Sequence, residues 1–269
     1  MNKKNFPIFI SLFIVSLFFA VIFYYGYTNM KANYGYYMAS SFYHGEIKEE
    51  LSNEDVEKLK SIEDIDLVGK MSLNPDNGKL ADDLVVINYQ DQAINKMREY
   101  SRLIEGRFAE KEDEIVLSES LVKENELKIG DKIELDLGKR FLDGEEIGPT
   151  SANTGREKFE SQGSKSFNLV GVYGDVYNKY SKLNFALGLQ DKMPSFRTFI
   201  KFNSFEEAYK NRNKIQSEIN KILGKDVHLE FSESLINYYG VENELLQNIM
   251  KKAVLVLSVL GCIAIFVFL

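Results

Sequence analysis

Two apolar runs near the ends of the chain constrain its architecture more than any other feature. Asn5 to Met30 contains no charged residue, and Ala253 to Leu269 is still apolar where the sequence stops. Roughly 20 apolar residues cross the hydrocarbon of a bilayer as a helix. The second run has 17 residues, a marginal length, and we expect it to continue beyond Leu269. We therefore predict transmembrane helices at 1–30 and 253–269, the second of them truncated.

A cleavable signal peptide is the alternative interpretation of the first run, because Lys3 and Lys4 imitate its basic n-region. The apolar core exceeds the usual ~7–15 residues and no A-x-A-like cleavage site follows it, which favours an uncleaved anchor. The two lysines favour a cytoplasmic start, whereas Lys251 and Lys252 argue weakly for the opposite orientation. The first helix usually dominates orientation. We therefore expect a multi-pass protein of the cell membrane with residues 31–252 outside the cytoplasm.

The middle of the chain is acidic. All 40 Asp and Glu lie between Glu46 and Glu244, and residues 31–252 contain 31 of the 33 Lys and Arg, so this middle part carries a net charge of −9. Such a domain is a poor candidate for binding nucleic acid or an anionic lipid surface. Cys262, the single cysteine, has no partner, so disulfides play no part. Membrane lipid around the two helices is the only lipid contact that we expect.

The pattern of apolar residues predicts an α+β domain. Its first part has a helix capped by Ser52 and strands at Ile65–Leu73 and Leu84–Tyr89. In the second part, a strand at Arg197–Phe202 precedes a helix with an S-x-x-E capping box, and a strand at Val227–Phe231 follows that helix. This is a β-α-β unit of the split type.

The predicted domain boundaries follow from this division. The two halves of a split β-α-β core cover about 31–100 and 197–233, and a mainly-β subdomain is inserted at about 101–196. Helical stalks connect the domain with the membrane, near Lys31 to Tyr37 and within 234–252, above all from Glu244 to Lys252.

The stretch from Glu105 to Leu137 is the most informative part of the insertion. It predicts a strand at Glu114–Leu117, a helix beginning near Ser118, and a strand at Lys132–Leu137. Gly106 and Gly130 are predicted turn positions, and five apolar residues are predicted core: Ile115, Leu117, Ile129, Ile133 and Leu135. Gly138 to Ser166 follows as 29 mostly polar residues, which we expect to form a mobile hairpin tip or an unstructured excursion.

No convergent set of catalytic or metal-binding residues is visible. His44 and His228 each stand alone in a predicted strand, without another ligand at a recognisable spacing. Asp76-Asn77-Gly78 and Asp143-Gly144 resemble fragments of calcium loops but lack the alternating oxygen ligands and terminal Glu, so turns explain them better. We therefore predict no catalytic, cofactor-binding or metal-binding residues, and no cofactor.

Serine nucleophiles and nucleotide binding are also disfavoured. Ser118 and Ser234 have no G-x-S-x-G elbow around them, and helix capping explains both. The acidic run of Glu110, Glu112, Asp113 and Glu114 is expected to be a solvated face. The chain contains no G-x-x-x-x-G-K-[ST] motif, so it does not hydrolyse nucleotides through a P-loop.

The segment EGRFAEKEDEIVLSESLVKENELKIGDKIEL resembles the core of the extracytoplasmic domain in MacB/FtsX-like permeases of ABC transporters. In that family a similar succession of G-R, E-I-V-L-S-E-S-L-A and L-K-I-G-D-K-I-x-L recurs. A strand resembling FNLVGVYGD, here Phe167 to Asp175, follows it. The shared motifs are turns and strands of the scaffold rather than catalytic residues.

The resemblance implies a permease subunit with four transmembrane helices and a large domain between the first two. Such subunits dimerise and couple ATP hydrolysis by a separate ABC ATPase chain to movements of the outer domain, a mode called mechanotransmission. Their substrates include peptides, lipoproteins, lipids and antibiotics. The present sequence departs from this pattern by lacking the third and fourth helices and a long cytoplasmic segment before the first.

The alternative from a different class is a two-helix membrane sensor whose outer domain binds a ligand. A sensor would continue into a cytoplasmic signalling module after Leu269, whereas a permease would continue into two more apolar segments. A tethered enzyme ranks third, because no acid, base or metal set converges.

Overall fold

The computed structural model describes residues 24–26, 28, 42–98, 103–151, 153–174 and 183–239. The chain forms two compact units, Met38–Ser232 and the combination of Met1–Tyr37 with Glu233–Leu269. Most of both apolar runs lies outside the described residues. In the first run, 24–26 and 28 are helical and the Thr28 hydroxyl donates a hydrogen bond to the Tyr24 carbonyl, 2.9 Å away. None of the helices in the described part is long and apolar enough to span a membrane.

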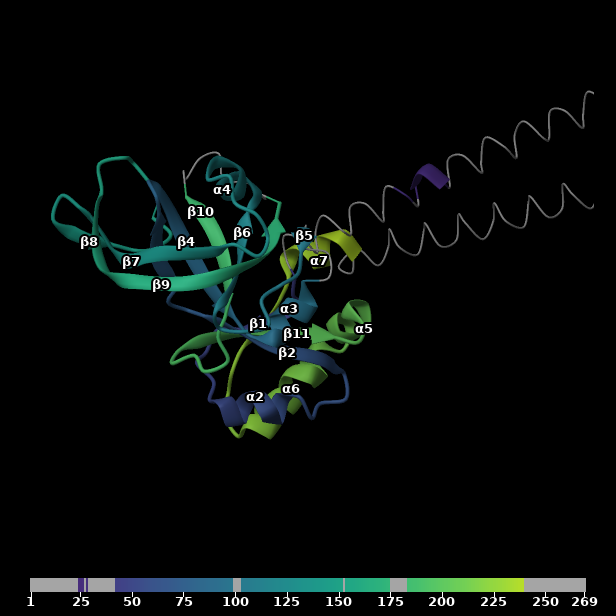
Figure 1. Ribbon diagram of the computed structural model, residues 1–269. Coiled ribbons are helices and arrows are strands. Elements are labelled where there is room, and N and C mark those ends of the chain that lie inside the picture. The colour runs from purple at the N-terminus through teal and green to yellow at the C-terminus, as the bar shows by residue number, and fades with distance from the viewer. Residues whose placement is uncertain are drawn as a thin grey trace, which may run out of the picture. The chain divides into compact units, whose positions relative to one another are not determined.

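Four antiparallel strands form one sheet of the Met38–Ser232 unit (Figure 1). They are β1 (Gly45–Ile47), β2 (Ile65–Ser72), β11 (Phe196–Phe202) and β12 (Leu229–Phe231), in the order β2-β11-β1-β12. The helices between them are α2 (Asn53–Leu59), α5 (Phe205–Lys210) and α6 (Arg212–Leu223). The chain thus makes β1-α2-β2 and later β11-α5-α6-β12, which is the split β-α-β arrangement, and the predicted α+β class is confirmed.

The helices that connect the strands of this sheet begin where the capping residues predicted. Ser52 accepts a hydrogen bond from the Asp55 backbone at 3.1 Å, and the Asp55 carboxylate accepts one from the Ser52 backbone in return. Ser204 likewise accepts from the backbone of Glu207. The single helix predicted after Ser204 is interrupted at Asn211, so α5 and α6 are separate, and α6 ends at Gly224 in the left-handed conformation.

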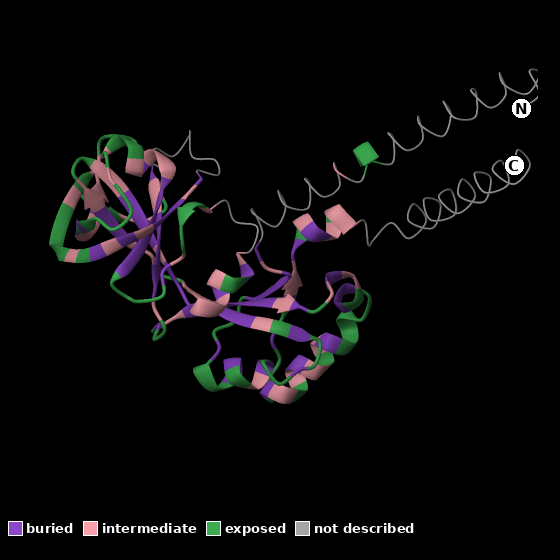
Figure 2. Cartoon of the chain, turned by 45° about the vertical axis from the view of Figure 1, so that its right-hand side comes forward, coloured by how far each residue is buried: buried purple, intermediate pink, exposed green. Residues whose placement is uncertain are grey.

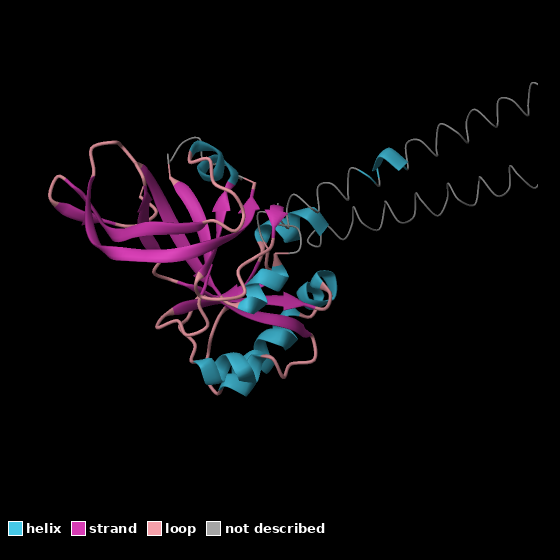
Figure 3. Cartoon of the chain, in the orientation of Figure 1, coloured by secondary structure: helices cyan, strands magenta, loops and turns pink. Residues whose placement is uncertain are grey.

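Six further strands close into a barrel. Among the described residues their pairing runs β10-β6-β9-β7-β3-β4, and β4 pairs back with β10. Their bounds are β3 Asp76–Leu80, β4 Asp83–Gln90, β6 Glu114–Ser118, β7 Lys132–Leu142, β9 Lys158–Tyr173 and β10 Asn184–Leu189. Figure 3 shows that this part is almost all strand, whereas most helices lie around the four-stranded sheet.

The remaining strands and helices of the described residues are short. The strands β5 (Leu103–Gly106) and β8 (Glu145–Ile147) pair with β9 and β7 outside the ring, and α4 (Glu119–Glu124) follows β6. Helix α3 (Gln92–Met97) packs with Phe42 and Phe199 on the four-stranded sheet. The last described helix, α7 (Glu233–Tyr239), belongs to the other unit.

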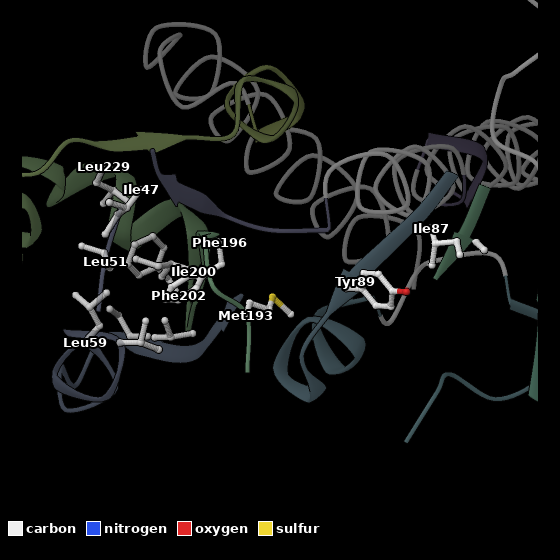
Figure 4. Close-up of a cluster of buried hydrophobic side chains, with 14 of the residues drawn as sticks. Ile47, Leu51, Leu59, Ile87, Tyr89, Met193, Phe196, Ile200, Phe202 and Leu229 are labelled. Carbon is white, nitrogen blue, oxygen red and sulfur yellow. The ribbon is translucent and has the colours of Figure 1, made fainter. Parts of the chain in front are cut away.

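The strand predicted at Leu84–Tyr89 lies mainly in the barrel. As β4, it pairs along its length with β3 and β10 and meets β2 only at the Met71–Gln90 pair. One buried cluster nevertheless runs through both parts. Figure 4 shows it extending from Leu59 and Ile200 through Phe196 and Met193 toward Tyr89 and Ile87. The two parts therefore share a core.

The buried residues follow the interior of the barrel and the inner faces of the four-stranded sheet (Figure 2). Of the predicted core residues in the central stretch, Ile115, Leu117, Ile133 and Leu135 are almost fully buried. Ile129 is 37% exposed, so its assignment to the core is wrong. It lies in the turn between α4 and β7.

Of the two predictions for 138–166, a mobile hairpin tip or an unstructured excursion, the second is wrong for the described residues, because they form a paired ribbon. Strand β7 continues to Leu142, β8 follows a turn, and β9 begins at Lys158 and pairs with β7 from Lys132 to Phe141. The β9 part of this ribbon, from Lys158 to Ser166, is mostly exposed, and it contains few apolar residues. Cross-strand pairing, rather than burial of one apolar face, holds it.

Two turn predictions have opposite outcomes. Asp143-Gly144 forms the β7–β8 turn with φ values of 53° and 92°, as expected. Asp76-Asn77-Gly78 is not a turn but the start of β3. It pairs with Ile87 to Val85 of β4, and Asn77 and Gly78 lie opposite Gly138 and Leu137 of β7, respectively.

Candidate functional site

The two histidines occupy different environments and make no contact with each other among the described residues. His44 precedes β1, is 5% exposed, and accepts a hydrogen bond at Nδ1 from the Phe202 backbone, 3.1 Å away. Burial, with the nearby charge of Lys201, lowers the pKa of His44 to about 4. His228 precedes β12 and is exposed. No group of three or more potential metal-ligating side chains occurs in the described part of the chain.

Of the two serines predicted to cap helices, Ser234 lies inside α7, which begins at Glu233, so its predicted capping role is wrong. Ser118 occupies the N-cap of α4, although its side chain makes no capping bond, and it lies 3.4 Å from Ser120. Glu110 and Glu112 are exposed, as a solvated face requires. Glu114 is different, because it is only 5% exposed. The expectation of a solvated face is therefore wrong for Glu114.

Arg107 and Glu114 form a bidentate ion pair, which the sequence patterns did not predict. The two guanidinium nitrogens of Arg107 lie 2.7 Å from the two carboxylate oxygens of Glu114, which also accepts from the Glu110 backbone. The hydrogen bonds from Arg107 lower the pKa of Glu114 to about 2, although burial opposes the shift. The pair ties the β5–β6 connection to the barrel wall, and its role is architectural.

The chain enters and leaves the Met38–Ser232 unit at one place. Strands β1 and β12 are antiparallel neighbours, so Gly45 at the start of β1 lies opposite Phe231 at the end of β12. The Ser232 backbone then donates a hydrogen bond to the His44 carbonyl at 3.0 Å. The first and last strands of the four-stranded sheet therefore begin and end at neighbouring residues.

A pocket of about 310 Å³ lies at one end of the barrel. The first residue of β3 and the ends of β4 and β10 meet there, with the neighbouring parts of β7 and β9. The residues that line it are Ser72, Asn74, Asp76, Tyr89, Glu112, Leu137, Lys165, Leu189, Gln190 and Pro194. Barrel mouths are a common place for small-ligand sites. We call this cavity the mouth pocket.

Charged and aromatic groups meet in the mouth pocket. The Lys165 ammonium lies 4.7 Å from the ring centre of Phe167 and 5.4 Å from that of Tyr89. The Tyr89 hydroxyl is hydrogen-bonded to Asp76, and burial, with the charge of Asp76, raises the pKa of Tyr89. The predicted strands gave no sign of this convergence, because Lys165 falls in the segment expected to be a loop.

Comparison with known proteins finds likenesses among solved structures only. No protein-family model matches the sequence, and no curated protein matches it either. One similar structure is the periplasmic region of MacB from Actinobacillus actinomycetemcomitans. Its sequence is 13% identical and its TM-score is 0.45, over 72% of this chain and 83% of that chain.

A second similar structure is the extracellular domain of the noncanonic ABC-type transporter YknZ from Gram-positive bacteria. Its sequence is 10% identical and its TM-score is 0.41, over 68% of this chain and 90% of that chain.

Proposed function

We propose that this chain is the N-terminal part of an ABC transporter permease, with residues 31–252 as its extracytoplasmic domain. The observation that carries the proposal is the pairing of Gly45 in β1 with Phe231 in β12. A domain placed between two consecutive membrane helices needs its two connections at one place. The resemblance of the central stretch to MacB/FtsX-like permeases supports the same role.

Because β1 and β12 are paired, the domain could move as a rigid body when the segments that connect it with the membrane move. The sheet continues from β12 through β1 into β11 and β2, and β2 meets the barrel strand β4. A displacement applied at His44 and Ser232 would pass into a hydrogen-bonded sheet rather than into a loop. This is the mechanical requirement of mechanotransmission.

The partners in this proposal are an ABC ATPase on a separate chain, a second permease copy and the surrounding lipid. In the proposal the chain has no catalytic activity of its own. The cargo would be a peptide, lipoprotein, lipid or antibiotic that is exported or extracted from the membrane. The division into a membrane helix at 1–30, the outer domain with its insertion at about 101–196, and a second membrane helix at 253–269 belongs to the same proposal.

Copurification tests the proposed assembly. The natural protein that contains this chain should be tagged and extracted in mild detergent, and an ATPase subunit with a P-loop should accompany it. Recovery of a stable protein that never brings an ATPase with it would contradict the proposal. Two further apolar segments downstream of Leu269 in the natural protein would support it independently.

The predicted stalk at 234–252 gives a test of coupling. A Leu246→Pro substitution should interrupt a helix there by removing one backbone donor, whereas Leu246→Ala should preserve the helix. We expect the proline variant alone to lose transport while the outer domain stays folded. Normal transport by the proline variant would contradict coupling through this stalk.

A further inference from the structure

The mouth pocket combines a cation, two carboxylates and an apolar wall in a space of about 310 Å³. That volume is near the lower end of the range for small-molecule sites. The wall includes Leu137, Leu189 and Pro194, and the charged side chains come from Asp76, Glu112 and Lys165. A ligand of this size would therefore meet both polar and apolar surface.

Lys165 supplies the positive side. Its ammonium lies over the rings of Phe167 and Tyr89, at 4.7 and 5.4 Å from their centres, and no acidic side chain among the described residues forms an ion pair with it. Lys139, in contrast, lies 2.7 Å from Glu146 on the exposed ribbon. The aromatic rings hold the Lys165 ammonium but accept no conventional hydrogen bond, so its N–H donors are available to an anionic group.

Asp76 and Glu112 supply the negative side. The Tyr89 hydroxyl, itself in a side chain only 6% exposed, hydrogen-bonds to Asp76 and fixes it at the start of β3. Glu112 is exposed on the β5–β6 connection and lines the same pocket. A carboxylate accepts several hydrogen bonds, so Asp76 can bind an ammonium group while it keeps its bond from Tyr89.

This charge distribution selects among ligand classes. A phosphate or another polyanion would face two carboxylates, and a ligand with an ammonium alone would leave Lys165 without an anionic partner. A molecule with one ammonium and one carboxylate satisfies both sides, and an aliphatic side chain would contact Leu137, Leu189 and Pro194. We propose that the mouth pocket binds a small zwitterion, an aliphatic amino acid or a dipeptide, with its carboxylate at Lys165 and its ammonium at Asp76 and Glu112.

Calorimetric titration of the purified full chain in detergent tests the assignment. The probes are leucine, leucyl-leucine, isopentylamine, which lacks the carboxylate, and 4-methylpentanoate, which lacks the ammonium. We expect leucine or the dipeptide to bind at least about tenfold more tightly than either single-charge analogue. The stronger of the two zwitterions identifies whether the site takes a free amino acid or a short peptide.

Three variants locate the binding. Lys165→Gln and Asp76→Asn should each weaken zwitterion binding about tenfold, whereas Lys139→Gln, on the same ribbon but outside the pocket, should change it less than about twofold. Thermal unfolding of all three variants controls for folding. Loss of affinity in Lys165→Gln with an unchanged unfolding temperature would support the site.

The proposal is overturned if neither zwitterion binds, if the single-charge analogues bind equally well, or if Lys165→Gln binds like the unaltered chain. The titration requires no ATPase. A failed titration would therefore remove this ligand assignment without touching the proposed permease role, which copurification tests separately.

Discussion

Arg140 and Glu157 form an ion pair inside the exposed β7–β9 ribbon, with Nη2 of the arginine 3.2 Å from Oε1 of the glutamate and side chains 0% and 3% exposed. The Arg140 guanidinium also donates to the Pro149 and Ser151 carbonyls, and Glu157 accepts from the backbones of Thr154 and Gly155. The polar residues between β8 and β9 thus surround the buried guanidinium of Arg140 instead of an apolar core.

We expect Arg140→Met to destabilise the outer domain by about 3–5 kcal/mol, because it leaves the Glu157 carboxylate buried without its cation. The neighbouring Lys139→Met is the matched control. It breaks the exposed pair with Glu146 and should cost less than about 1 kcal/mol. Urea unfolding of the two variants measures the difference. Equal midpoints for both would show that Arg140 does not hold the 148–157 segment.

Ser52 and Ser118 provide a second matched comparison. Both occupy N-cap positions, but only Ser52 makes the capping bond, in a reciprocal box with Asp55. We expect Ser52→Ala to cost about 1 kcal/mol and Ser118→Ala less. The free energies of unfolding from urea titrations decide between them. A larger loss in Ser118→Ala would show that its contact with Ser120 matters more than the cap of α2.

Substitutions at Gly106 and Gly130 distinguish the energetic cost of backbone strain from that of a steric conflict. Both have positive φ, at 77° and 96°. A Cβ on Gly106 would lie 2.2 Å from the Val170 carbonyl oxygen, whereas one on Gly130 would meet nothing within 4 Å. Gly130→Ala should therefore cost about 1–2 kcal/mol from the left-handed conformation alone, and Gly106→Ala more. Thermal unfolding checks the order, and equal losses would contradict the close approach of β5 to β9.

Acid should lower the free energy of unfolding by protonating three carboxylates of the folded chain. Hydrogen bonds from Arg107 to Glu114 and from Lys225 to Asp55 lower both pKa values to about 2. Burial of Glu157 opposes ionisation, but backbone donors of the 154–157 segment and Arg140 lower its pKa to about 2 as well. Because these pKa values lie below the unfolded ones, the stabilisation is complete above about pH 4.5 and lost as pH falls toward 2. Glu114→Gln should reduce that loss, measured by urea unfolding across this range.

Strands and helices with a local signal, either alternating apolar residues or a capping residue, could be predicted from the sequence. Pairings between strands that are far apart in the sequence could not. Strand β6 and the α2 cap follow directly from their own residues. The parallel pairing of Asn184 with Val85, which closes the barrel, joins segments with no shared local signal. The same limit applies to the mouth pocket. Lys165 and Asp76 become neighbours only because β9, β7, β3 and β4 lie side by side in the closed ring.

His44 should add a second, less acidic step to the pH dependence. Its folded pKa of about 4 lies below the ordinary value of 6.5, so the folded chain binds fewer protons than the unfolded chain between those values. The stabilisation from neutral His44 is therefore complete above about pH 6.5 and declines as pH falls toward 4. His44→Asn offers an acceptor to the Phe202 backbone without titrating, and should unfold with a flatter slope across this window.

The matched variant for His44→Asn is His228→Asn, at the exposed histidine before β12. The measurement is the free energy of unfolding from urea titrations at intervals from pH 7 to 4. Equal slopes in the original chain and in His44→Asn would mean that the imidazole is not held neutral where the chain enters the sheet. A flatter slope only in His44→Asn would establish that acid loosens the junction of β1 and β12, where His44 bonds to both Phe202 and Ser232.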